Sequence, residues 1–253
     1  MSVSRTYSNG KGCAPDAVEK MKIVLMQPYL FPYIGYFQLI RASDRFVVHD
    51  DVQYIRQGWI NRNQIILHNR KFLFVCSVKH DNYSKNINER SYTDAFEAEA
   101  KKLLRNIDQS YSKAPYFVEV RALLADVLGN PERNVSRFNT LAIRNLCQYL
   151  GIHTEFLLSS EMEFEKSLVA ESRVIAINKE LGSTHYINPI GGTDLYSKDR
   201  FQEHGIQLSF LKPRLSPYKQ STAEFIPGMS IIDIMMNCSR EEFLEMLEDY
   251  ELI

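Results

Sequence analysis

The spacing of apolar residues changes along the chain, and each spacing predicts a different element. Residues 21–26 form a nearly continuous apolar run with the length of a buried strand, and residues 45–49 repeat this pattern. Between them, Ile34, Phe37 and Ile40 recur at helical spacing, which predicts a helix over residues 33–42. A strand, a helix and a second strand in this order form a βαβ unit, whose two strands run parallel.

A polar and aromatic loop, residues 52–63, separates this unit from a predicted β-hairpin. Residues 64–67 and 71–78 have strand patterns on either side of His68-Asn69-Arg70. Asn69 suits the left-handed conformation that a tight hairpin turn requires.

Three amphipathic stripes then predict helices across about 94–150, which we interpret as a helical insertion. Capping and turn residues predict where these helices begin and end. We expect Asp94 with Glu97 as a capping pair at the start of the first helix, Pro115 in the first turn of the second and Gly129 at its end, and Ser136 and Gly151 at the two ends of the third.

Alternating strands and helices return in the last part of the chain. The predicted strands are 152–158, 184–188 and 206–211, and the predicted helices between them are 168–181 and 197–204. Two helices close the chain, with Ser230/Asp233 and Ser239/Glu242 as expected capping boxes. The fold class we expect is α/β, with a mostly parallel, Rossmann-like sheet, a β-hairpin and the helical insertion.

Composition narrows the class of protein. The net charge of −1 gives no long-range attraction to nucleic acid or to an anionic membrane, and no apolar run has the length of a membrane span. Residues 1–20 are polar, so we expect a disordered extension without a signal peptide, followed by a single domain over 21–253. The four cysteines form no CxxC pair, and Cys76 with His80 lacks a second pair, so we expect reduced thiols, a cytoplasmic protein and no metal site.

Three loops follow predicted strands: residues 27–32, 50–63 and 188–193. The carboxyl ends of parallel strands lie at one edge of a sheet, so we expect these loops to converge on one site. Asp50 and Asp51 are the candidate catalytic residues, as a proton acceptor or a cation ligand, and an exposed acidic turn is the structural alternative. His49, His80 and His185 are further candidate proton carriers.

Aromatic, amide and cationic side chains in the same loops predict substrate binding. Arg62 offers a planar guanidinium for phosphate or carboxylate, asparagine amides suit hydroxyl groups, and Trp59 offers a platform for a ring. A turn with two glycines can bring backbone N–H groups close to an anion. The candidate substrate-binding residues are Gln27, Tyr29, Tyr54, Trp59, Asn61, Arg62, Asn63, Asn188, Gly191 and Gly192.

Several of these segments resemble the WbqC-like family, from about residue 21 to the end of the chain. The segments are 26–37 (MQPYLFPYIGYF), 50–54 (DDVQY), 58–63 (GWINRN), 113–117 (KAPYF), 186–192 (YINPIGG) and 225–233 (FIPGMSIID). The resemblance implies a bacterial cytosolic protein of surface-polysaccharide biosynthesis, such as that of O-antigen. It also implies, as one suggested activity, the transfer of an amino acid such as glycine to an amino sugar.

The first strand, aromatic loop and helix also look like the start of nucleotidyltransferases with a HIGH-type motif, such as pantothenate synthetase. Those enzymes activate a carboxylate with ATP, so ATP and Mg²⁺ are the candidate cofactors. This chain departs from that motif, because Tyr33-Ile34-Gly35-Tyr36 stands in place of the paired histidines.

Three functions remain open on these grounds. The first is an enzyme that transfers a small acyl or aminoacyl group to the amine of a nucleotide-linked deoxyamino sugar. The second is a non-catalytic module that binds a nucleotide sugar or takes part in glycan assembly, alone or as a homo-oligomer. The third is a glycosyltransferase, although Asp50-Asp51 lacks the spacing of a DxD metal motif.

Overall fold

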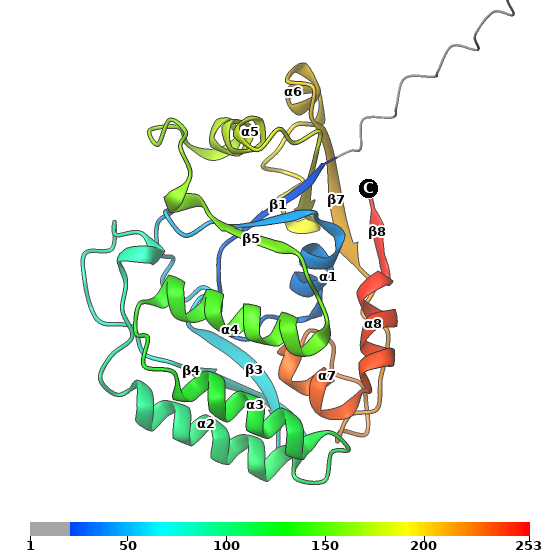
Figure 1. Ribbon diagram of the computed structural model, residues 1–253. Coiled ribbons are helices and arrows are strands. Elements are labelled where there is room, and N and C mark those ends of the chain that lie inside the picture. Colours follow the sequence, from blue (N-terminus) through cyan, green and yellow to red (C-terminus); the bar gives the residue numbers. More distant parts are fainter. Residues whose placement is uncertain (1–20) are drawn as a thin grey trace, which may run out of the picture.

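A central sheet organises the computed structural model, which describes residues 21–253. Its strand order is β5-β2-β1-β6-β7-β8, and the first five of these run parallel while β8 is antiparallel to β7 (Figure 1). The strands are β1 (Lys22–Met26), β2 (Arg45–Val48), β5 (Glu155–Leu158), β6 (His185–Pro189), β7 (Gln207–Pro213) and β8 (Tyr250–Leu252). The expected α/β class and its mostly parallel sheet are confirmed.

The parallel strands follow the Rossmann order, counted along the chain as 3-2-1-4-5. In this order the chain direction across the sheet reverses between β1 and β6, which pair side by side from Lys22 with His185 onward. This reversal opens a crevice outside the carboxyl ends of the central strands.

Strand residues alternate between two hydrophobic clusters, one on each face of the sheet. Val24 and Phe46 belong to the large cluster, whereas Ile23 and Val47 belong to the small cluster. The large cluster contains α1 (Ile34–Ala42), α4 (Val135–Leu150), α7 (Ile231–Asn237), α8 (Arg240–Glu248) and the hairpin, and the small cluster contains α5 (Ala170–Glu180) and α6 (Lys198–Glu203). Figure 1 shows these two groups of helices on opposite sides of the sheet.

The hairpin of β3 (Arg62–Leu67) and β4 (Arg70–Val75) is a separate two-stranded sheet. His68 and Asn69 have φ angles of 52° and 59°, the left-handed pair that the expected tight turn needs. β3 begins two residues earlier than predicted, because Arg62 and Asn63 pair with Val75 and Phe74.

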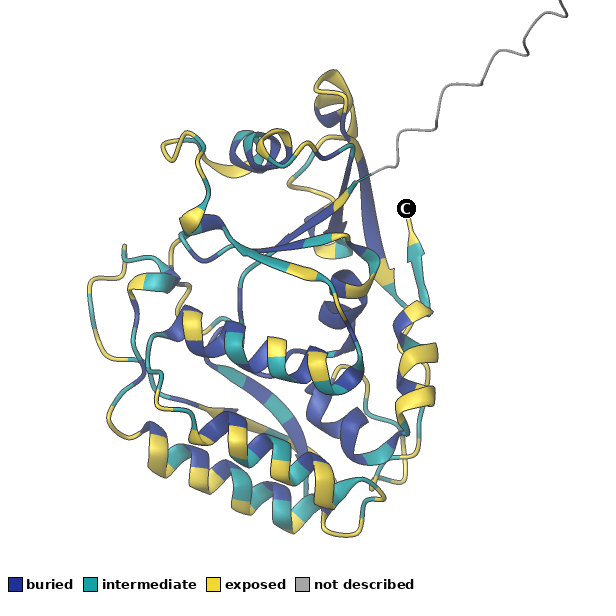
Figure 2. Ribbon diagram, viewed as in Figure 1, coloured by how far each residue is buried: buried dark blue, intermediate teal, exposed yellow. Residues whose placement is uncertain are grey.

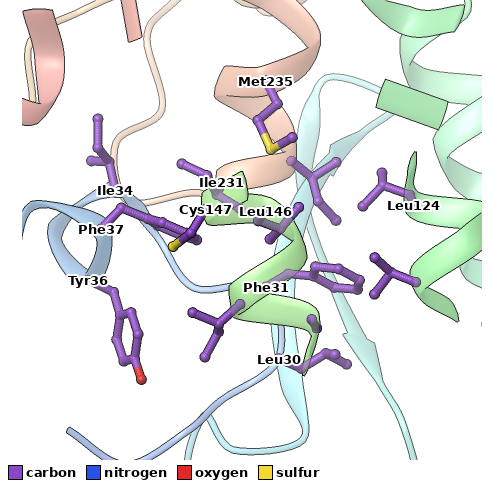
Figure 3. Packing of buried hydrophobic residues seen from close by; sticks show 14 of the residues in the cluster. Leu30, Phe31, Ile34, Tyr36, Phe37, Leu124, Leu146, Cys147, Ile231 and Met235 are labelled. Atoms are coloured by element: carbon purple, nitrogen blue, oxygen red, sulfur yellow. The ribbon is translucent and has the colours of Figure 1, made fainter. Parts of the chain in front are cut away.

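Two long helices cover the hairpin on the side away from the main sheet, α2 (Phe96–Tyr111) and α3 (Phe117–Gly129). Their outer surfaces carry exposed residues, whereas the central strands β1, β2 and β6 of the main sheet are largely buried (Figure 2). Figure 3 shows Leu30 and Phe31 of the first loop among the large-cluster side chains, which also include Leu124 of α3 and Leu146 of α4.

The structure corrects two predicted capping pairs. α2 begins at Phe96 without a side-chain cap, because Asp94 forms an ion pair with Lys79 instead. At α7, Ser230 caps the helix but Asp233 does not complete the box, since its carboxylate accepts hydrogen bonds from Tyr111 and Tyr218. The Ser239/Glu242 box is confirmed at α8.

One strand was not predicted from the sequence, and one predicted segment lies outside the described residues. The antiparallel strand β8, which follows α8, was not predicted because its three residues are too short to show a pattern. The predicted disordered extension, residues 1–20, lies outside the described residues. Among the helices of residues 21–253, none is long and apolar enough to cross a membrane.

We predict that the two capping sites differ in their effect on stability. Ser239→Ala removes an oxygen that accepts the Glu242 N–H, and should lower the free energy of unfolding by about 1 kcal/mol. Asp94→Ala, the matched control, removes only an exposed ion pair and should change it by less than about 0.5 kcal/mol. Urea denaturation of both variants measures this, and an equal loss would contradict the assigned caps.

Candidate functional site

A cleft of about 480 Å³ lies at the carboxyl ends of β1, β2 and β6. Residues from all three loops line it, together with the segment after η3 (Ile190–Gly192). Its polar and aromatic lining residues include Gln27, Tyr29, His49, Trp59, Asn188 and Tyr196. The cleft therefore occupies the crevice where the strand order reverses, the usual ligand position in an open α/β sheet.

The first loop supplies one amide and one phenol to the cleft. Tyr29 packs edge-on against Tyr36 with ring centroids 5.0 Å apart, which fixes the orientation of its ring. The side-chain amide of Gln27 forms no hydrogen bond with any residue of the described chain, 21–253. Gln27 is thus the lining residue with an uncommitted donor and acceptor.

Large apolar side chains form the rim of the cleft. Ile55, Trp59 and Leu195 are 55%, 50% and 70% exposed, although each has a large apolar surface. Ile55 and Trp59 come from the second loop, whereas Leu195 follows η3. Exposed apolar groups gathered around a hollow indicate a binding surface rather than a free surface.

Asn188 and Gly192 form a tightly packed wall of the cleft. The Asn188 Oδ1 atom accepts a hydrogen bond from the Tyr186 hydroxyl at 2.8 Å, and its Nδ2 atom donates to the Pro189 carbonyl at 3.1 Å. A Cβ atom on Gly192 would lie 1.9 Å from Asn188 Nδ2, whereas one on Gly191 would meet nothing within 4 Å. A side chain at position 192 would therefore displace the Asn188 amide from its hydrogen bonds.

His49 follows β2 directly and is the titratable lining residue nearest the sheet edge. Its Nε2 atom accepts a hydrogen bond from Arg173 Nε at 3.1 Å, so the ring proton lies on Nδ1. Burial, and then the Arg173 charge, lower the pKa of His49 to about 4, against a smaller raising effect of Asp51. The imidazole is therefore neutral at pH 7.

Asp51 holds the arginine that contacts His49. Its carboxylate forms ion pairs with Arg173 Nη2 at 2.6 Å and Lys166 Nζ at 3.2 Å, and it accepts a hydrogen bond from the Ser159 hydroxyl. Burial acts to raise the pKa of Asp51, but the hydrogen bonds from Ser159 and Arg173 outweigh it and lower the pKa to about 2. Asp51 is ionised at neutral pH and does not line the cleft.

Asp50 is buried and connects three parts of the fold. Its carboxylate accepts hydrogen bonds from the Ser160 N–H at 3.0 Å, the Ser160 hydroxyl at 2.9 Å and the Ser136 hydroxyl at 3.2 Å. These contacts join the end of β2 to the first turn of α4 and to η2 (Ser159–Glu161). Asp50 thus connects elements of the fold, and Asp51 positions Arg173. The catalytic roles of the two aspartates stay predictions.

The acidic pair does not fit a magnesium ion. Serine donors occupy Asp50, and two cationic side chains occupy Asp51, so neither carboxylate presents free oxygen atoms to a cation. Within residues 21–253, no group of three His, Cys, Asp or Glu side chains is arranged to hold a metal.

The other predicted binding residues lie outside the cleft. Tyr54, Asn61 and Arg62 line a neighbouring hollow, and the Tyr54 hydroxyl donates to Asn61 Oδ1 at 2.9 Å. Asn63 is buried, and its Nδ2 atom donates to the carbonyls of Leu30 and Phe31 at 3.2 and 2.7 Å. Asn63 therefore holds the first loop in place and is not exposed to a ligand.

Sequence reasoning missed Asn139, which joins two of the loops. From α4, its Nδ2 atom donates to the carbonyls of Pro28 at 3.3 Å and Ile60 at 2.8 Å, while its Oδ1 atom accepts from the Tyr92 hydroxyl at 2.7 Å. The signal was a single asparagine next to Phe138 in an otherwise apolar stripe, because a buried amide there must have hydrogen-bond partners.

The match to known proteins covers most of the chain. The family model described as the WbqC-like protein family matches residues 27–245. The chain belongs to the WbqC-like protein family. An uncharacterized protein of Mycobacterium tuberculosis (strain ATCC 25618 / H37Rv), Rv1507c, is 27% identical to this WbqC-like protein over 223 residues, which are 87% of this chain and 95% of that protein. No solved structure significantly matches the present chain.

We predict that the two neighbouring glycines respond differently to alanine. Gly192→Ala must displace Asn188 Nδ2, and the loss of the Asn188 hydrogen bonds should cost about 1–3 kcal/mol of unfolding free energy. Gly191→Ala, the control, should change it by less than about 0.5 kcal/mol. If chemical denaturation shows the two variants to be equally stable, the described cleft wall is wrong.

The neutral, half-buried imidazole of His49 should make stability depend on pH. Its folded pKa of about 4 lies below the unfolded value of about 6.5, so the unfolded chain takes up the proton first as the pH falls. The His49 contribution is complete above pH 6.5 and is lost toward pH 4, by about 2 kcal/mol between pH 7 and pH 5. Urea midpoints at both pH values should fall less in His49→Gln than in the unmodified protein, and parallel curves would refute the neutral imidazole.

Proposed function

We propose that this WbqC-like protein is a cytoplasmic enzyme of surface-polysaccharide (O-antigen) biosynthesis. It transfers a small acyl or aminoacyl group, such as glycine, to the amine of a nucleotide-linked deoxyamino sugar. The observation that carries the proposal is the cleft at the reversal of the strand order, where aromatic, amide and imidazole groups from three loops meet. The role in polysaccharide biosynthesis comes from the family resemblance.

The lining of the cleft suits a ligand with both ring and hydroxyl groups. Trp59 and Tyr29 offer faces for a sugar or base ring, and Gln27 has a free amide for hydroxyl groups. The open space beside Gly191 leaves room for a phosphate or carboxylate at the turn.

His49 is the residue that we assign to the chemistry. In amide formation the sugar amine attacks the acyl carbon, a C–N bond forms, the acyl carbon loses its leaving group and the nitrogen loses a proton to solvent. Negative charge develops on the acyl oxygen, and the neutral Nδ1–H group of His49 can donate a hydrogen bond to it. Asp51 acts through Arg173 to hold the ring in this tautomer.

One observation favours the second function, a non-catalytic nucleotide-sugar-binding protein. The residues that line the cleft include no carboxylate, so the usual acceptor for the amine proton is absent from the lining. The binding protein would use the same aromatic and amide contacts without turnover.

A product assay together with a binding assay separates the two functions. Purified protein is incubated with glycine, ATP and a UDP- or dTDP-linked 4-amino sugar, and mass spectrometry follows the sugar. The transferase predicts a sugar heavier by one glycyl group, with ATP cleaved as the acyl group is activated. His49→Gln should lower kcat at least tenfold and leave KM within about threefold, because its contact strengthens as charge develops.

Trp59 provides the binding readout, since it is the single tryptophan of the chain and lines the cleft. A fluorescence change with the nucleotide sugar that inorganic pyrophosphate does not reproduce, without any product, identifies the binding protein. If the assay shows no product and no fluorescence change, both functions are contradicted.

A further inference from the structure

A second hollow of about 350 Å³ lies beside the cleft and is markedly basic. We call it the basic pocket; its charged lining residues are Arg56, Arg62, Lys79, His80, Asp81 and Arg90. The segment of residues 54–62 separates the two hollows. Ile55 and Trp59 line the cleft, whereas Arg56 and Arg62 line the basic pocket.

Three guanidinium groups in this pocket form no ion pair with a carboxylate of the described chain. Lys79 is paired with Asp94 at 3.1 Å, and Asp81 is paired with Lys85 at 2.8 Å. Arg56, Arg62 and Arg90 form no ion pair with any residue of the described chain. Asp81 is the one carboxylate that lines the pocket; it feels the charge of Arg90 but is shared with Lys85. The positive charges of the pocket therefore exceed the negative charge, which is unfavourable unless an anion joins them.

Arg90 contributes a buried positive charge to the basic pocket. Its side chain is buried, with the residue only 3% exposed, and its planar group lies 5.1 Å from the centre of the Tyr54 ring. One Nη2–H donates to the Asn82 carbonyl at 2.6 Å, but the buried Nε–H has no hydrogen-bond partner. A buried guanidinium with an unsatisfied donor is costly, and an anion in the pocket removes that cost.

The other two arginines lie around the same tyrosine. Burial raises the pKa of Tyr54, and the charges of Arg90, Arg62 and Arg56 each act to lower it, so all three lie near its hydroxyl. Arg62 Nε is held by the Gly58 carbonyl at 2.8 Å, which leaves its terminal nitrogens available. Arg56 Nη2 lies 3.5 Å from His80 Nε2.

We propose that the basic pocket is a binding site for a small phosphate-bearing anion, separate from the cleft. Planar guanidinium groups recognise phosphate oxygens with paired hydrogen bonds, and three of them match a polyanion better than a single carboxylate. The volume suits a small molecule, and the net charge of −1 gives no general attraction for nucleic acid. The proposal does not depend on the acyl-transfer function.

Binding in this pocket would also be felt at Trp59. The Arg62 guanidinium lies 5.8 Å from the Trp59 ring, so an anion that draws Arg62 into the pocket changes the environment of the indole. Trp59 fluorescence therefore reports on the basic pocket as well as on the cleft.

Calorimetric titration with inorganic pyrophosphate at low ionic strength tests the proposal on the whole chain. Arg56→Gln and Arg62→Gln should each weaken pyrophosphate binding about tenfold or more, and added NaCl should weaken it in the unmodified protein. These arginines are accessible to solvent, so their replacement does not leave a buried hole as Arg90 replacement would. Arg105→Gln, an exposed arginine outside the pocket, removes the same charge and should change the affinity less than twofold.

Three results would overturn this assignment. The first is no pyrophosphate binding by the unmodified protein in the millimolar range. The second is an equal loss in Arg105→Gln and Arg56→Gln, which indicates net charge alone. The third is a loss in Gly192→Ala but not in Arg56→Gln, which places the anion in the cleft.

Discussion

The geometry of the candidate site depends on two buried asparagine amides that satisfy the backbone of irregular loops. Residues 27–32 have no ladder hydrogen bonds of their own, yet their carbonyls lie inside the protein, where an unpaired carbonyl is costly. Asn63 binds two of these carbonyls and Asn139 binds a third. Because Asn139 also binds Ile60, the first and second loops are held against each other and form the cleft between them.

The aromatic turn serves the core and the cleft at the same time. Leu30 and Phe31 are fully buried in the large cluster, and Phe31 takes a left-handed φ of 48° to reach it. Gln27 and Tyr29, from the same turn, line the cleft. The strain at Phe31 is offset by hydrogen bonds to its carbonyl from Asn63 and Ser230, so the position of the cleft residues is set by packing several residues away.

The periodic parts of the fold were predictable because one physical cause dominates them. The apolar runs of β1 and β2 and the stripes of α2, α3 and α4 arise from burial, which the sequence displays directly. The convergence of loops followed from parallel pairing, without knowledge of any side-chain contact. β8 and the cap of α2 were missed because tertiary contacts decide them: the β8 pairing with β7, and the Lys79 partner of Asp94.

The individual site residues were harder to predict for a similar reason. Asp50, Asp51 and Asn63 have the chemistry of a site, but their partners come from residues that are distant in sequence, such as Ser160, Arg173 and Leu30. A sequence shows which groups can bind a ligand and does not show which are already occupied. His49 and Gln27 become the main candidates for catalysis and ligand binding only because the structure shows what each contacts.

We propose that three loops around the end of β1 together bind a nucleotide-linked amino sugar. Hydrogen–deuterium exchange of the whole chain, with and without a nucleotide-linked 4-amino sugar, tests it directly. We expect bound sugar to protect amides in residues 27–32, 55–60 and 188–196 together, since all three segments line the cleft. Bound sugar that leaves these segments unprotected, or that protects residues elsewhere on the fold, would contradict it.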